Sequence, residues 1–229
     1  MALDIKICGL KTSEAVDAAL HNGASHIGFI FFPKSPRNVS PELAGRLRPA
    51  AEGRAKAVAV TVDADDALLD EIIGAMRPDM LQLHGRETPE RVADVRARYG
   101  LPVMKALSIR DATDLAAIKP YLGIADRLLF DAKPPRGSDL PGGNGISFDW
   151  SLLAALDGDV DYMLSGGLNA GNIAEALART NAPGVDVSSG LERAPGEKDM
   201  RLIEEFFRAI RAAANERPSV LPEHDGAKR

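Results

Sequence analysis

Cys8 is the only cysteine in the chain, and it closes a short apolar run, 5–8, that is followed at once by Gly9. A free cysteine is often a small, buried and unreactive core residue. A thiol at the carboxyl end of a strand is also where a rigid scaffold can present a base or a nucleophile. The position of Cys8 by itself leaves both interpretations open.

Three more side chains could do chemistry at the ends of predicted strands or in the loops beside them. Asp131 ends the apolar run 127–131, where a carboxyl group can act as a general acid or simply cap a turn. His84 ends another run, where a histidine packs or hydrogen-bonds more often than it acts in catalysis. Arg37 lies in a proline-rich loop and is either solvated or presents a planar fork to a carboxylate.

Two turns rich in glycine and serine follow the last two predicted strands. The first contains Gly166 and Gly167, and the second contains Ser188, Ser189 and Gly190. Glycine lets the backbone approach phosphate oxygens closely, and a helical turn can direct N–H groups at them. Ordinary turns have the same composition, but two of them at adjacent strand ends favour a phosphate site.

These residues are spaced along eight repeats of a short apolar run and a longer amphipathic segment. The predicted strands are 5–8, 26–31, 57–62, 80–84, 103–107, 127–131, 162–165 and 185–187. Uninterrupted apolar runs are typical of parallel strands that are covered on both faces. The pattern predicts an α/β fold, a (β/α)8 TIM barrel forming a single domain over 1–214. The alternative, an open doubly wound sheet, lacks the glycine fingerprint that would follow the first strand.

Cap residues and apolar spacing mark the helices between these strands. Helix starts are expected at Ser13, Ser40, Thr88, Asp149, Asn172 and about Asp199, with further helices over 63–76 and 111–118. The segment 133–147 is too rich in proline and glycine for either element and is predicted to be a mobile loop. The polar tail 215–229 is predicted to be disordered.

Closing the barrel would arrange the candidate residues in a row. A phosphate at the last two strands would lie between Asp131 and Cys8, and Arg37 would lie beyond Cys8. The alternation of side chains places Lys6 on the same face as Cys8, Gln82 with His84, and Asp186 with Ser188, and we expect these pairs to face the barrel axis. A phosphorylated sugar that carries an acidic group would suit this row.

Composition excludes several other classes of protein. The net charge of the 229 residues is −5, which argues against general nucleic-acid binding. No apolar run reaches about 18 residues, so no membrane span is expected, and no signal peptide is apparent. Four scattered histidines and one cysteine show no metal-ligand spacing. We therefore expect a cytoplasmic protein with a small-molecule substrate, no metal and no cofactor.

Seven motifs in order along the chain resemble those of the phosphoribosylanthranilate isomerase family of tryptophan biosynthesis. They are Lys6-Ile7-Cys8-Gly9-Leu10, the segment from Gly28 to Arg37, Leu81-Gln82-Leu83-His84-Gly85, Leu129-Phe130-Asp131, Gly142-Gly143-Asn144-Gly145, Leu164-Ser165-Gly166-Gly167-Leu168 and the segment from Val185 to Glu192. Asn144 departs from the threonine expected in its loop, which would alter the loop and not the activity.

The resemblance implies an Amadori rearrangement of N-(5-phosphoribosyl)anthranilate to the 1-deoxyribulose amine without a metal or cofactor. It implies that Asp131 is the general acid and Cys8 the general base, and that Arg37 binds the anthranilate carboxylate. His84 and Asp186 would line the site, and the loop 133–147 would close over it. The glycine and serine residues of the two turns would bind phosphate. Cys8 must act as a thiolate, through either a lowered pKa or a minority thiolate population.

Three questions stay open from the sequence. A related histidine-pathway phosphoribosyl isomerase is the nearest rival, although such enzymes place an aspartate where this chain has Cys8. A non-catalytic barrel that binds phosphate ligands is the rival from another class. The protein could be a monomer or a homodimer.

Overall fold

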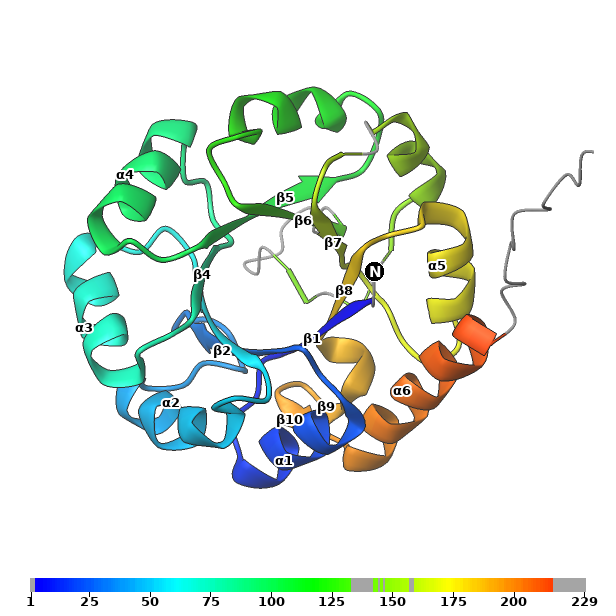
Figure 1. The fold of residues 1–229 in the computed structure, drawn as a ribbon, viewed down its shortest axis with the longest axis horizontal. Helices are drawn as coiled ribbons and strands as arrows, with labels where there is room; N and C mark the ends of the chain where they lie inside the picture. The colour runs from blue at the N-terminus through cyan, green and yellow to red at the C-terminus, as the bar shows by residue number, and fades with distance from the viewer. Residues whose placement is uncertain (1–2, 133–141, 144, 146, 157–158, 216–229) are drawn as a thin grey trace, which may run out of the picture.

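A computed structural model shows a closed barrel of eight parallel strands in the order β1 to β8, surrounded by a ring of helices (Figure 1). It describes residues 3–132, 142–143, 145, 147–156 and 159–215. The strands are β1 Asp4–Cys8, β2 His26–Phe31, β3 Lys56–Thr61, β4 Met80–Leu83, β5 Val103–Ile109, β6 Arg127–Ala132, β7 Tyr162–Leu164 and β8 Gly184–Val187. The predicted (β/α)8 barrel is confirmed, with strand ends shifted by one or two residues.

Helices cover the outer face of the barrel. The α-helices are α1 Ser13–Asn22, α2 Pro41–Leu47, α3 Asp66–Met76, α4 Pro89–Tyr99, α5 Ile173–Thr180 and α6 Met200–Asn215, and the 3₁₀ helices are η1 Arg48–Ala51, η2 Asp114–Tyr121, η3 Trp150–Ala155 and η4 Ser189–Leu191. The units after β5 and β6 therefore contain 3₁₀ helices, where the sequence predicted ordinary helices. Pro120 inside η2 removes a backbone donor, which is one reason that this segment does not continue as an α-helix.

Side chains cap most helix starts. Ser40 and Thr88 accept hydrogen bonds from Leu43 and Arg91, as predicted. For α1 the prediction was wrong by one residue, because Thr12 and not Ser13 accepts the bond from Ala15 N–H. These caps fix where each helix leaves the strand that precedes it.

The core has two layers. One packs the outer faces of the strands against the helices, and the other fills the barrel with Cys8, Val58, Val60, Met80, Met104, Ala106, Leu129 and Met163. Buried polar side chains on the same inward-facing positions include Lys6, Gln82 and Asp186. The expected alternation of inward and outward residues is confirmed on β1, β4 and β8.

A short antiparallel hairpin follows β8 and was not predicted. Its strands are β9 Glu192–Ala194 and β10 Glu197–Lys198, and it lies beside α1 in Figure 1. Two strands of three and two residues, rich in charge, carry no period-2 apolar pattern from which they could be recognised.

Two predicted features lie mainly outside the described residues. These are the loop 133–147, of which only Gly142, Gly143, Gly145 and Ser147 are described, and the tail 215–229, of which only Asn215 is described. Within the described part of the chain, no helix is long and apolar enough to cross a membrane.

Candidate active site

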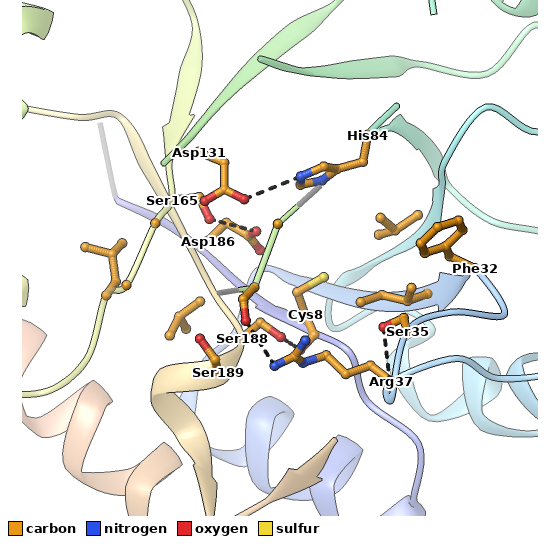
Figure 2. A pocket seen from close by; sticks show the side chains of 18 of the residues that line it. Cys8, Phe32, Ser35, Arg37, His84, Asp131, Ser165, Asp186, Ser188 and Ser189 are labelled. Carbon is orange, nitrogen blue, oxygen red and sulfur yellow. Dashed lines mark hydrogen bonds and ion pairs between the residues drawn. The ribbon is translucent and has the colours of Figure 1, made fainter. Parts of the chain in front are cut away.

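A cavity with an empty volume of about 660 Å³ opens at the carboxyl ends of the barrel strands (Figure 2). Nine of the ten predicted site residues line it: Cys8, Arg37, His84, Asp131, Gly166, Gly167, Asp186, Ser188 and Ser189. The tenth, Gly190, lies behind the wall against the Leu168 carbonyl. The strand order thus brings together residues that are far apart in sequence, such as Cys8 and Ser188, which are 180 positions apart.

Cys8 is 4% exposed and ends β1, with its sulfur directed into the cavity (Figure 2). Lys6 lies one inward position earlier on the same strand and forms an ion pair with Asp186, with 2.8 Å between Nζ and Oδ1. The Lys6 ammonium and the Cys8 sulfur both lie 3.1 Å from the place that a Cβ on Gly28 would occupy. A cation therefore lies beneath the thiol, already paired with a carboxylate.

Burial raises the pKa of the Cys8 thiol above its ordinary value. The positive charges of Lys6 and Lys198 oppose this rise, and the carboxylate of Asp186 adds to it. Lys6 itself stays protonated, because the opposing charges of Asp186 and Cys8 raise its pKa despite its complete burial. Cys8 could act as a base through a lowered pKa or through a minority thiolate population, and its raised pKa in this site favours the minority thiolate population.

Asp131 and His84 form a pair on the wall formed by β4 and β6. Asp131 Oδ2 lies 3.4 Å from His84 Nε2, and Asp131 Oδ1 accepts a hydrogen bond from Ala132 N–H at 2.9 Å. His84 Nδ1 lies 2.8 Å from Gln82 Nε2, one inward position earlier on β4. With the amide in this orientation Nδ1 accepts, so the ring carries its proton on Nε2, facing Asp131.

Arg37 is 5% exposed and reaches the cavity across the end of β1. Gly9 makes this crossing possible, because its φ is 78° and a Cβ there would lie 2.7 Å from Arg37 Cδ. The Nε and Nη2 atoms of Arg37 each donate to a different oxygen of Glu192, both at 2.8 Å. The remaining guanidinium nitrogen, Nη1, lies near Gly143 at the cavity wall.

The turns after β7 and β8 form one corner of the cavity. Gly166 and Gly167 have φ of 92° and 62°, a backbone conformation that other residues rarely adopt. Ser188 Oγ donates to the carbonyl of Cys8 at 3.0 Å, so this corner is hydrogen-bonded to the backbone of the last residue of β1. Lys198 Nζ donates to the Ser188 carbonyl at 3.0 Å and places a buried cation behind the turn.

Several residues of the site were not found from the sequence. Apolar side chains from β2, β3 and the loops after them cover one wall: Ile30, Phe32, Val60 and Val62. Gln82, Glu192 and Lys198 contact residues of the cavity wall. The alternation of side chains placed Gln82 inward but did not give its contact with His84, and Glu192 and Lys198 were not singled out. Glu192, like Gln82, lies within a quoted motif, and this was a signal that could have been followed.

The arrangement places a carboxyl group and a thiol on different walls of one cavity, with a guanidinium group at one end and a turn of glycine and serine residues at the other (Figure 2). This suits proton transfers on a ligand that carries two anionic groups. No three histidine, cysteine, aspartate or glutamate side chains of the described residues are grouped so that they could hold a metal ion.

Comparisons with known proteins agree with this arrangement. Residues 5–209 match a family model described as N-(5'-phosphoribosyl)anthranilate (PRA) isomerase. The chain is 75% identical over 218 residues to the N-(5'-phosphoribosyl)anthranilate isomerase of Brucella canis, covering 95% of this chain and 98% of the relative. It is similar to the crystal structure of phosphoribosyl anthranilate isomerase from Thermotoga maritima, with 32% identity, a TM-score of 0.83, and coverage of 92% of this chain and 100% of the other.

A further solved structure is a phosphoribosyl anthranilate isomerase in complex with reduced 1-(o-carboxyphenylamino)-1-deoxyribulose 5-phosphate. It is 29% identical, with a TM-score of 0.80, and covers 92% of this chain and 100% of its own.

Proposed function

The chain belongs to the N-(5'-phosphoribosyl)anthranilate isomerase family, and from this premise we propose that Asp131 and Cys8 are the acid and base of its reaction. The protein is an isomerase of tryptophan biosynthesis, and the resemblance inferred from its motifs is confirmed. The histidine-pathway isomerase and the non-catalytic barrel are thereby set aside as its main function. The roles of Asp131 and Cys8 are proposed from the geometry of the site.

In the proposed Amadori rearrangement, protonated Asp131 donates its proton to the ribose ring oxygen. The bond between this oxygen and the first sugar carbon breaks, and the anthranilate nitrogen supplies the electron pair of a protonated imine. The Cys8 thiolate then removes the proton on the second carbon, which gives an enolamine. Tautomerisation of the enolamine yields the ketose, so no electrons are lost and no redox cofactor is needed.

The observation that carries this assignment is the placement of Asp131 and Cys8 on different walls of one cavity (Figure 2). A ring oxygen and a carbon-bound proton on one sugar need two groups that approach from different directions. Of the predicted strand-end residues, these two combine proton-transfer chemistry with burial below 5% exposure. Asp131 also has His84 Nε2 within 3.4 Å, which keeps its carboxyl group on this wall of the cavity.

The two ends of the cavity suit the two anionic groups of the substrate. We assign the phosphate to Gly166, Gly167, Ser188 and Ser189, supported by their turns and by the buried cation of Lys198. Gly190 contributes by keeping the turns in close contact. We assign the anthranilate carboxylate to Arg37, whose Nη1 side faces the cavity, and the ribose to His84 and Asp186.

Purified protein should remove the fluorescence of N-(5-phosphoribosyl)anthranilate much faster than its spontaneous decay. Asp131→Asn and Cys8→Ala should each lower kcat about 10³-fold, because each removes a proton-transfer group. Exposed Arg193→Ala is the control and should keep wild-type kinetics. A rate near wild type in either site variant, with folding verified by circular dichroism, would remove that residue from the mechanism.

The location and assembly of the protein remain proposals. We propose a cytoplasmic enzyme, supported by its biosynthetic role and by a single cysteine that is free. We propose a monomer or a homodimer; a Thermotoga maritima relative is described as a dimeric enzyme from which monomers were generated. Sedimentation velocity would distinguish the two states.

A further inference from the structure

The hairpin β9–β10 contributes two buried charged residues beside the cavity, Glu192 and Lys198. Their side chains are 3% and 2% exposed, although the rest of the hairpin is largely open to solvent. Both carboxylate oxygens of Glu192 are engaged. Oε1 accepts from Arg37 Nε at 2.8 Å and from Lys198 Nζ at 2.6 Å, and Oε2 accepts from Arg37 Nη2 at 2.8 Å and from Gly196 N–H at 3.1 Å.

We propose that Glu192 is a positioning residue that holds the guanidinium of Arg37 in the orientation needed to bind the substrate's carboxylate, and that Lys198 connects this pair to the phosphate corner. The inference rests on the proposed role of Arg37. Neither Glu192 nor Lys198 lines the cavity, so both act through the residues they hold.

The geometry of the pair fixes Arg37. Two parallel hydrogen bonds to one carboxylate define the plane of a guanidinium, which a single bond cannot do. They use the Nε–Nη2 edge, and Nη2 also donates to the carbonyl of Gly143 at 3.4 Å, whereas Nη1 lies beside Gly143 at the cavity wall. A long side chain that is already held in its binding conformation loses less rotamer freedom when the ligand arrives, so the affinity for that ligand rises.

Lys198 extends the same unit to the other end of the site. Its ammonium donates to the carbonyl of Ser188 at 3.0 Å and lies 3.3 Å from Ser188 Oγ. Ser188 Oγ donates in turn to the carbonyl of Cys8. One hairpin is thereby connected to Arg37 at the proposed carboxylate end, to Ser188 at the proposed phosphate corner, and through Ser188 to the backbone of Cys8.

The charges of this unit also favour an anionic ligand. Two basic side chains, Arg37 and Lys198, share one carboxylate. Burial lowers the pKa of Lys198 from its ordinary value, and the carboxylate of Glu192 opposes this fall. The two basic side chains keep the pKa of Glu192 below its ordinary value despite burial, so the carboxylate stays ionised. Buried basic groups are stabilised when a substrate with two anionic groups binds beside them.

Glu192→Gln is the direct test, because glutamine keeps the shape of the side chain and loses the charge and one acceptor. We expect the KM for N-(5-phosphoribosyl)anthranilate to rise about tenfold while kcat changes less than about threefold, since a binding contact and not a proton transfer is disturbed. Glu197→Gln is the matched control: Glu197 lies in the same hairpin but is exposed and forms an ion pair with Arg193. Its KM should equal that of the wild type.

A double-mutant cycle separates positioning from general destabilisation. Arg37→Ala should raise KM, and adding Glu192→Gln to it should change KM by less than about twofold, because there is no longer a guanidinium to orient. Additive effects would overturn the inference. If the Gln variant does not fold, Glu192→Asp carries the test, and a KM within about twofold of wild type in that variant would overturn the inference as well.

The same series distinguishes this inference from the assignments on which it rests. An unchanged KM in Arg37→Ala would remove Arg37 as the carboxylate partner and the inference with it. A raised KM in Arg37→Ala beside an unchanged KM in Glu192→Gln would overturn only the positioning role of Glu192.

Discussion

The surroundings of Cys8, the proposed base, keep its thiol mostly protonated at rest. The Lys6 ammonium lies next to the sulfur, but its charge is shared with Asp186, and burial dominates the pKa of the thiol. A substrate that binds beside Cys8 would displace water and change this balance. In the proposed mechanism, a small thiolate population of Cys8 faces a carbon-bound proton of the substrate, and proximity makes this population effective.

The labelling of Cys8 by iodoacetamide should report this raised pKa. Because only the thiolate reacts, the rate should keep rising above pH 8.5, the approximate pKa of an ordinary thiol. Cys8 is the only cysteine, so mass spectrometry follows one site, and Cys8→Ser is the control. A labelling rate that levels off below pH 8 would contradict the environment described for the thiol.

The sequence identified residues that touch the cavity better than residues that hold others in place. Cys8, Asp131 and Arg37 were predictable because strand ends and unusual loops mark them. Gln82 and Glu192 were not, since their roles depend on which element folds against which. A hydrogen bond between residues 155 positions apart, such as that from Arg37 to Glu192, leaves no local pattern.

At the scale of the elements, the loops after β7 and β8 form one surface because they pack closely. Gly190 lies so near the Leu168 carbonyl that a Cβ there would overlap it. The strand pairing of β7 with β8 brings these loops together, and η4 begins in the second of them. The spacing of the groups proposed to bind phosphate therefore depends on Gly190, which is not itself at the cavity wall.

Gly190→Ala should loosen this contact. We expect KM to rise about tenfold and the free energy of unfolding to fall by about 1–3 kcal/mol, because the added methyl group forces the two loops apart. The control is Gly74→Ala in α3, where nothing lies near the added Cβ. That change should leave KM unaltered and raise the free energy of unfolding by about 0.5–1 kcal/mol.

The strands were predictable to within two residues and the α-helices to within three, since the helix predicted over 63–76 begins at Asp66, whereas the irregular elements were not predictable. Apolar runs and caps such as Ser40 and Thr88 are local signals, and the structure confirms them. The 3₁₀ segments η2 and η3 and the hairpin β9–β10 depend on packing against neighbours, which no local pattern records. The hairpin is the omission with the most consequence, because it carries Glu192 and Lys198.

At the scale of the whole molecule, both ends of the barrel contain buried titratable side chains. The carboxyl end holds the site, and the amino end holds His26, which is 2% exposed. Ser25 Oγ lies 2.8 Å from His26 Nδ1, while Nε2 has no hydrogen-bond partner among the described residues. Burial, together with the nearby cations, lowers the pKa of His26 to about 4 despite the opposing charge of Asp4.

This histidine should make the barrel sensitive to acid. An unfolded histidine binds a proton below its ordinary pKa of 6.5, whereas the folded one resists protonation down to about 4, so its contribution is complete above 6.5 and is lost as the pH falls. We expect it to lower the free energy of unfolding by about 2 kcal/mol between pH 7 and pH 5. Urea unfolding of His26→Gln should lack this loss, whereas the exposed-site control His21→Gln should retain it.

The barrel closes between its first and last strands, where β1 pairs with β8 from Asp4↔Gly184 to Ile7↔Val187. On a ribosome that adds about 5–20 residues per second, Lys6 exists for roughly 10–40 s before Asp186 is made. During that interval the nascent chain has an open sheet edge at β1 and a cation without its carboxylate. Chaperones that cover exposed strands would act in this window, and a message cut short before the codons of β8 would yield a chain that cannot assemble the site.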